Sequence, residues 1–285
     1  MENKKLKDLL VRTISGAVLL LVVVGALIWS KWSAGALFAV IMLGGLVEFY
    51  RLCEKGGVKP MRFLGLAASL ALFGLFFTVF IQGIGKAAVG DLIPALLLYF
   101  ILIISSAFIC ELWRKSTTPI ANIATTLMGV IYVAMPMAFV LFIPQMLTDS
   151  WSPMVMLAFI SIIWINDVFA YLVGVSIGKH RLCERISPKK SWEGFFGGLI
   201  GAVGASLLYG HLFDGNILVW GGLGLITSLT GVAGDLVESM FKREVNVKDS
   251  GNMIPGHGGF LDRFDALYMA VPFVYAYLLI VGEFL

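Results

Sequence analysis

Long apolar runs separated by short polar segments dominate this chain of 285 residues. The runs are about 20 residues long, which is the length an α-helix needs to cross a hydrocarbon core of roughly 30 Å. We therefore expect an all-α integral membrane protein. The pattern predicts nine transmembrane helices, at about residues 12–30, 33–50, 63–85, 91–112, 121–146, 153–175, 193–213, 216–240 and 262–283.

Composition supports a membrane protein, since 59% of the residues are apolar and 14% are charged, whereas soluble proteins carry roughly 25% charged residues. The first run resembles a signal peptide in its basic flank, but its apolar core, from Ile14 to Trp29, is long and leads directly into a second span. We therefore expect it to be a retained helix. Residues 4–10 either lie on the membrane surface with their leucines toward lipid or fray.

The basic residues predict the orientation. With a cytoplasmic N-terminus, 19 of the 21 lysines and arginines fall in inside segments, all but Lys31 and Lys86. Positive charge is retained on the cytoplasmic side of short loops. We therefore expect a multi-pass protein whose N-terminus is cytoplasmic.

The two halves of the chain differ in polar content. Residues 1–152 are expected to form an N-terminal transmembrane scaffold of about five helices. Residues 153–285 are expected to form a C-terminal catalytic region of about four helices with two basic cytoplasmic loops. The three cysteines show no pairing pattern and are expected to be free thiols; they are Cys53, Cys110 and Cys183.

Polar side chains within the later spans are the strongest functional signal, because charge inside a bilayer is costly. Neighbouring carboxylates repel one another unless a cation or a proton lies between them. An oxygen-only cluster suits Mg²⁺; the alternative for Asp167 or Glu238 is a structural ion pair with a lysine. Three pairs lie at similar predicted depth: Asn166 with Asp167, Asp235 with Glu238, and Asp262 with Asp265.

Basic side chains and glycines surround these acids in the two last inside loops. Lysine, arginine and glycine backbone beside a carboxylate-held metal indicate a polyphosphate site; the alternative is contact with anionic lipid. His257 is a hydrogen-bond donor to phosphate, a general acid or base, or a packing group. The basic set is Lys179, Arg181, Arg185, Lys189, Lys190, Lys242, Arg243 and Lys248, and the glycines are Gly256, Gly258 and Gly259.

The segment from Ser239 to Asp265 resembles the signature of the phosphatidate cytidylyltransferases, also called CDP-diacylglycerol synthases. The upstream stretch that begins at Asn166 and includes SPKKSWEG resembles the same family, with Ser191 where threonine is common. The resemblance covers roughly residues 160–275 by motif. The matching signature positions are Ser239, Lys242, Arg243, Lys248, Asp249, Gly251, Pro255, His257, Gly258, Gly259, Asp262, Arg263 and Asp265.

The resemblance implies a reaction of CTP with phosphatidate that yields CDP-diacylglycerol and diphosphate, with Mg²⁺ and a second cation at the acidic cluster. It implies a site facing the cytoplasm of a bacterial-type plasma (inner) membrane, and direct displacement is the expected mechanism. The implied metal ligands are Asp235, Asp262 and Asp265, which act in catalysis with Lys242, Arg263 and His257. The implied substrate-binding residues are Asn166, Asp167, Lys179, Lys189, Lys190, Ser239, Arg243, Lys248, Asp249, Gly258 and Gly259.

Two other functions fit parts of the pattern. A CDP-alcohol phosphotransferase would need a longer motif around Asp-Gly, and Asp214–Gly215 stands without it. A cation-coupled transporter could use the buried acids as an ion path, but such groups usually lie near mid-bilayer. Membrane lipid is an expected partner and nucleic acid is not. Small residues permit a homo-oligomer or close packing within one chain; they are Gly44, Gly45, Gly197, Gly198 and Gly201.

Overall fold

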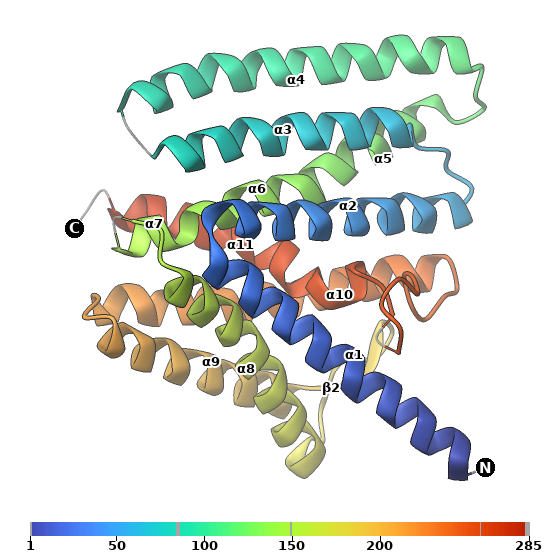
Figure 1. The fold of residues 1–285 in the computed structure, drawn as a ribbon. Coiled ribbons are helices and arrows are strands. Elements are labelled where there is room, and N and C mark those ends of the chain that lie inside the picture. The colour runs from blue at the N-terminus through green and yellow to red at the C-terminus, as the bar shows by residue number, and fades with distance from the viewer. Residues whose placement is uncertain (1, 84–85, 149, 257, 283–285) are drawn as a thin grey trace.

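The computed structural model describes residues 2–83, 86–148, 150–256 and 258–282 (Figure 1). Within these residues, nine helical stretches are long and apolar enough to cross a membrane, which confirms the predicted all-α membrane class. Eight of them are single helices: α1 (Glu2–Trp29), α2 (Lys31–Lys55), α3 (Arg62–Gln82), α4 (Lys86–Arg114), α8 (Pro153–Ile177), α9 (Trp192–Leu212), α10 (Ile217–Glu244) and α11 (Leu261–Gly282). Because α1 begins at Glu2, residues 4–10 continue the first helix.

The remaining span is interrupted. Proline at position 136 lacks the N–H that would continue the hydrogen-bond ladder, and helices change register at such positions. The segment is π-helical directly before this turn and 3₁₀-helical directly after it. Its parts are α5 (Pro119–Gly129), η1 (Val130–Ala134), α6 (Met135–Phe139), η2 (Val140–Phe142) and α7 (Ile143–Thr148).

A short antiparallel hairpin, which the sequence did not predict, follows α8. It consists of β1 (Arg181–Cys183) and β2 (Ser187–Ser191). In Figure 1, this hairpin, the α10–α11 loop and the start of α1 lie toward one end of the bundle, and the end of α11 lies at the other. The basic loops therefore gather at one end, as the sequence predicted, while the side of the membrane that this end faces stays a prediction.

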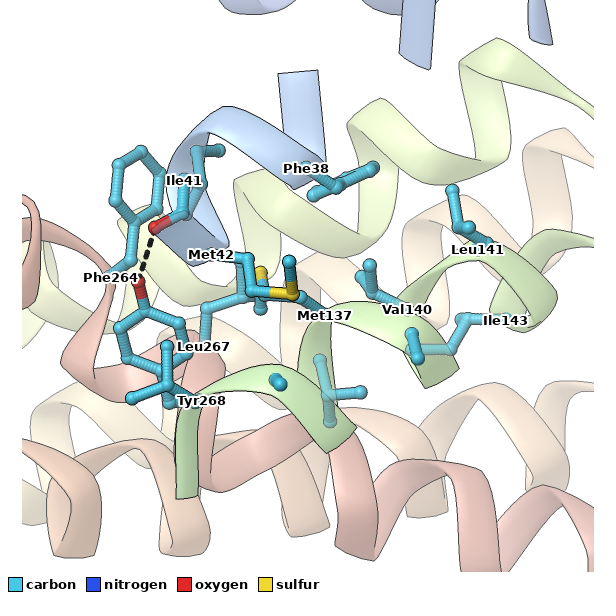
Figure 2. Packing of buried hydrophobic residues seen from close by; sticks show 14 of the residues in the cluster. Phe38, Ile41, Met42, Met137, Val140, Leu141, Ile143, Phe264, Leu267 and Tyr268 are labelled. Atoms are coloured by element: carbon cyan, nitrogen blue, oxygen red, sulfur yellow. Dashed lines mark hydrogen bonds between the residues drawn. The ribbon is translucent and has the colours of Figure 1, made fainter. Parts of the chain in front are cut away.

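The best-buried core joins α11 to the N-terminal half (Figure 2). The hydroxyl of Tyr268 on α11 donates a hydrogen bond to the backbone oxygen of Ile41 on α2 at 3.0 Å. Apolar side chains from α2, the interrupted span and α11 surround this contact. They include Phe38, Ile41, Met42, Met137, Val140, Leu141, Ile143, Phe264, Leu267 and Tyr268. The helix that carries Asp262 and Asp265 is thus anchored against helices from the start of the chain.

Glycines bring the last four helices together. A Cβ atom on Gly198 of α9 would lie 2.8 Å from the backbone oxygen of Asn166 on α8. A Cβ atom on Gly234 of α10 would lie 2.5 Å from the backbone oxygen of Asp265 on α11. Such close approach is the usual role of small residues between membrane helices. These glycines contact helices of the same chain, which accounts for them without an oligomer.

Candidate active site

Four carboxylates from three helices line one cavity of about 500 Å³. Asp167 lies on α8, Asp235 lies on α10, and Asp262 and Asp265 lie on α11. The rest of the wall is mostly apolar and comes from α1, α2, α8 and α11, with Arg263 also present. Residues that the sequence placed at similar depth therefore meet in space, and they do so beside a hydrophobic surface.

Asp262 is held by several donors. The Lys242 ammonium donates to Oδ1 at 2.8 Å. The backbone N–H of Gly259 donates to Oδ2 at 2.9 Å, and that of Ser250 lies 3.1 Å and 3.0 Å from the two oxygens. Both carboxylate oxygens therefore fix the loop before α11, and Asp262 acts as an organiser of that loop in this conformation.

Lys242 joins two acids of the cluster. Its Nζ lies 2.5 Å from Oε2 of Glu238, one turn earlier on α10, and 2.8 Å from Oδ1 of Asp262. The Glu238 side chain is only 1% exposed. The structure thus agrees with the alternative in which Glu238 pairs with a lysine. Lys242 is occupied by these carboxylates and stabilises their charge inside the bundle.

A second cavity, of about 560 Å³, adjoins the hairpin between α8 and α9. Its wall includes Arg181, Lys189 and Lys190 together with small and apolar residues of α8 and α9. Asp167 and Asp235 line this cavity as well as the first one. Across this shared boundary, the Lys190 ammonium forms an ion pair with the carboxylate of Asp235.

Asn166 supports one of the shared acids. It is 3% exposed, and its Oδ1 accepts a hydrogen bond from the Ser228 hydroxyl at 2.6 Å. Its Nδ2 donates to Oδ1 of Asp167 at 3.3 Å. The side chain therefore connects α10 to α8 and orients Asp167, and it also lines the second cavity.

Other predicted residues are not among those given for the two cavities. Lys179, Lys248 and Asp249 are exposed in loops and line neither of these two cavities. Arg243 donates to the backbone oxygens of Ile186 at 3.3 Å and Val247 at 3.4 Å, so it ties the end of α10 to the hairpin. Ser239 is half-buried on α10 beside Glu238. His257 lies outside the described residues.

Gly258 and Gly259 stabilise the conformation of the loop before α11. Gly258 has φ +86°, a left-handed conformation that glycine adopts without steric cost. Its backbone oxygen accepts a hydrogen bond from the N–H of Ile254 at 2.8 Å. The N–H of Gly259, which we expected to face an anion, donates to Asp262. The loop glycines therefore allow a tight turn around Asp262.

One residue of the site was missed in the sequence. Glu48 on α2 is 1% exposed, and its Oε2 accepts the backbone N–H of Leu261 at 2.9 Å and the Ser250 hydroxyl at 3.4 Å. A lone glutamate within an otherwise apolar span was a signal of function. Glu48 falls within residues 1–152, which the sequence predicts to be scaffold.

The donor chemistry of the site fits Mg²⁺ only in part. Within the described residues, no group of three or more His, Cys, Asp or Glu side chains is arranged to hold a metal ion. Asp167, Asp235 and Asp265 offer carboxylate oxygens around the cavities, whereas those of Asp262 already accept several hydrogen bonds. Mg²⁺ is usually bound by one or two carboxylates and completed by phosphate oxygens and water, so this arrangement fits a site that substrate would complete.

Comparison with known proteins identifies the class. A family model described as "Cytidylyltransferase family" matches residues 10–281 of this chain. The chain therefore belongs to the cytidylyltransferase family, and it is an enzyme, a nucleotidyltransferase. A transporter or a CDP-alcohol phosphotransferase is not supported by this match.

Individual relatives make the class more specific. The chain is similar to a phosphatidate cytidylyltransferase of Staphylococcus aureus (strain COL), with 36% identity over 248 residues, covering 80% of this chain and 92% of the relative. A phosphatidate cytidylyltransferase of Staphylococcus saprophyticus is 32% identical over 264 residues, covering 92% and 96%. One from Haemophilus influenzae is 45% identical over 133 residues, covering 44% and 46%. These relatives confirm the predicted phosphatidate cytidylyltransferase family.

Proposed function

We propose that this enzyme transfers a cytidylyl group from CTP to phosphatidate, forming CDP-diacylglycerol and diphosphate, at the cytoplasmic face of a bacterial plasma membrane. The names of the relatives support the reaction. The gathering of basic loops at one end of the bundle supports the orientation, because cytoplasmic loops retain positive charge (Figure 1). The membrane location is supported by the nine apolar helical stretches in the described part of the chain.

The observation that carries this proposal is the pair of cavities that meet at Asp167 and Asp235. One cavity is lined by apolar side chains of α1, α2 and α8 beside the carboxylates and Arg263, so it suits a lipid with a charged headgroup. The other includes Arg181, Lys189 and Lys190 and suits a polyphosphate. An enzyme that joins a water-soluble nucleotide to a membrane lipid needs two such spaces with one common boundary, whereas an enzyme with two soluble substrates does not.

We assign the phosphatidate chains to the first cavity and the CTP triphosphate to the second. The apolar wall from α1, α2 and α8 would receive the acyl chains near the headgroup. Lys189 and Arg181 would bind phosphate oxygens. Lys190 and Asp235 both line the second cavity. When CTP binds there, the Lys190 ammonium would leave its ion pair with Asp235 and bind the triphosphate.

The chemistry would be a direct displacement. An oxygen of the phosphatidate phosphate attacks the α-phosphorus of CTP, a new P–O bond forms, and the bond to the leaving diphosphate breaks. Mg²⁺ held by Asp235 and Asp265 would neutralise charge on the phosphates. Arg263, which lines the lipid cavity, would balance the negative charge of the phosphatidate headgroup. The nucleophile is already anionic, so no protein group has to take a proton from it.

The test is an assay of purified protein with phosphatidate in mixed micelles, CTP and Mg²⁺. We expect CDP-diacylglycerol and diphosphate in equal amounts, and neither product when phosphatidate is omitted. A second arm supplies labelled diphosphate and CTP without lipid. Label that enters CTP rapidly under these conditions would require a covalent cytidylyl-enzyme and would contradict direct displacement.

A further inference from the structure

The loop between α10 and α11, residues 245–260, belongs to the family signature, and we call it the signature loop. It packs against α2, a helix about 200 residues earlier in the chain. On α2, Gly44 and Glu48 are four residues apart and therefore share one face. The ring of Phe260 packs at Gly44, where a Cβ atom would lie 2.6 Å from it. The next residue, Leu261, donates its backbone N–H to Glu48 at 2.9 Å. This face of α2 therefore receives the end of the loop and the first residue of α11.

Two loop glycines leave room for the Glu48 carboxylate. A Cβ atom on Gly251 would lie 2.2 Å from its Oε1, and one on Gly259 would lie 2.1 Å from its Oε2. No side chain fits at either position while the carboxylate stays in place. The need for glycine at these positions of the signature is therefore explained by a residue outside the signature.

Stability alone does not account for this carboxylate. Glu48 is 1% exposed within a membrane span, and its Oε1 has no hydrogen-bond partner in the described part of the structure. A buried polar atom without a partner costs free energy, and an apolar side chain would avoid that cost. The N–H of Leu261 belongs to the first turn of α11, where the helix dipole favours a negative charge.

Glu48 and Asp262 hold the same short loop from two sides. Ser250 donates its backbone N–H to Asp262 and its hydroxyl to Glu48. Gly259 donates its N–H to Asp262 and packs against Glu48. Any displacement of the loop from Glu48 would therefore change the hydrogen bonds that orient Asp262.

We propose that Glu48 is a positioning residue for cytidylyl transfer, which clamps the signature loop so that Asp262 and the start of α11 keep their places in the active site. It does not line either cavity among the residues given for them, so it acts through the loop and not on substrate. The activity readout of this inference rests on the proposed function, whereas its structural readout does not.

The structural readout is the mobility of the loop. Met253 is 47% exposed in this loop, so we choose it as the position for a reporter. A nitroxide label would be attached through Met253→Cys in a background in which the three native cysteines are alanine. Glu48→Ala should change the electron paramagnetic resonance spectrum toward a mobile label, because the loop loses its acceptor on α2. Glu48→Gln keeps an acceptor oxygen of the same reach and should keep the label immobile.

The kinetic readout uses the same variants. For Glu48→Ala we expect kcat for CDP-diacylglycerol formation to fall on the order of 10- to 100-fold, as displaced catalytic groups produce, with the KM for CTP changed less than about threefold. Glu48→Gln should stay within about threefold of the parent in both constants. A matched control is Glu111→Ala, since Glu111 is 4% exposed and accepts hydrogen bonds from Asn122 and Arg114 outside the site.

Several outcomes would overturn the inference. One is a Glu48→Ala enzyme with an immobile label and parental kinetics per folded molecule. Another is a Glu48→Gln enzyme as impaired as Glu48→Ala with an immobile label, which would assign the effect to the charge of Glu48. If Glu111→Ala mobilised the label equally, the effect would be general destabilisation. If the parent enzyme formed no CDP-diacylglycerol, the proposed function would be rejected. The mobility of the label would then be the test of whether Glu48 holds the signature loop in place.

Discussion

Where α3 meets the interrupted span, aromatic rings interlock. The ring of Phe76 packs edge-on against Phe139 at 5.2 Å between centroids, and Phe80 packs edge-on against Phe142 at 6.1 Å. Where α8 meets α9, the contact is made by glycine. A Cβ atom on Gly197 would lie only 2.5 Å from Val173. After these two contacts we call residues 1–152 the aromatic-packed half and residues 153–285 the glycine-packed half, although large side chains such as Trp220 and Tyr268 are also buried in the later helices.

The difference shows where a polar site can be built in a membrane. Lipid tails are as apolar as the side chains, so helix association depends on packing and on hydrogen bonds between helices. Close backbones in the glycine-packed half let Asn166 and Ser228 bond across α8 and α10. The aromatic-packed half also has hydrogen bonds between helices, since Asn122 on α5 donates to Glu111 on α4 at 2.6 Å, but none of its carboxylates is among the residues given for the two cavities. Glu48 shows how the aromatic-packed half nevertheless contributes to the site, by binding a loop at its membrane edge.

The largest expected effect compares one acid from each half. Asp235→Asn removes a charge that lines both cavities, and turnover should fall on the order of 100- to 1,000-fold because electrostatic stabilisation of the phosphates is lost. Glu111→Gln, in the aromatic-packed half, should retain parental turnover per folded molecule. Both are measured by CDP-diacylglycerol formation across Mg²⁺ concentrations. Near-normal turnover of Asp235→Asn at low Mg²⁺ would contradict the assigned role.

The next effect concerns stability in the aromatic-packed half. Phe80 is fully buried and contacts Phe142 and Trp151. Phe80→Ala should lower the free energy of unfolding by about 3–5 kcal/mol, from lost contacts and a residual cavity. The molecules that remain folded should keep parental kcat, since no contact of Phe80 reaches the acids. Unfolding in detergent measures the loss of stability, and turnover per folded molecule measures kcat. A fall in kcat that accompanies the loss of stability would show that packing in the first half also determines the activity of the site.

A smaller effect tests the glycine packing. Gly198→Ala places a methyl group 2.8 Å from Asn166 on the neighbouring helix. It should cost about 1–3 kcal/mol of stability by overpacking and should lower turnover by moving Asn166 and Asp167. The matched control on the same helix is Gly204→Ala, because no atom lies within 4 Å of a Cβ atom there. Equal melting temperatures of the two variants would argue against close packing of α8 with α9.

The last prediction concerns the orientation of the protein in the membrane and is tested on the unaltered enzyme. Cys53 on α2 and Cys183 on β1 are free thiols, each partly buried. Both lie toward the end where the basic loops gather, so a membrane-impermeant thiol reagent should label them from the cytoplasmic side alone. Mass spectrometry of intact cells and inverted vesicles compares the two sides. Labelling of Cys183 from outside intact cells would reverse the orientation.

Much of the fold was predictable because each membrane span is a long run of apolar residues in the sequence. Most predicted spans differ from the observed helices by a few residues at each end, as with 216–240 against α10 (Ile217–Glu244), whereas α1 begins at Glu2, ahead of the predicted start at residue 12. The changes of helix type around Pro136 were not predictable, since they depend on how neighbouring helices satisfy the backbone. The hairpin after α8 was missed because its strands are too short to show an alternating pattern.

The site was predictable in its residue types and less so in their partners. Spacing placed Asp262 and Asp265 on one helix face, and a motif marked the loop before them. Spacing alone does not state that Asp262 accepts backbone N–H groups or that Lys190 pairs with Asp235. Glu48 was missed for a related reason: its partners are 202 and 213 residues away, so no local pattern contains them.

That separation has a consequence for how the protein is made. Because the chain is synthesised from its N-terminus, α2 with Glu48 is made long before Ser250 and Leu261, whose hydroxyl and N–H donate to the Glu48 carboxylate. During that interval the carboxylate has neither donor, and a polar group in a bilayer without a partner is costly. Synthesis of the last helix therefore completes two things together: the active site becomes whole, and the early helix loses its exposed charge. A nascent chain halted before α11 would carry that exposed carboxylate as a mark of its incompleteness.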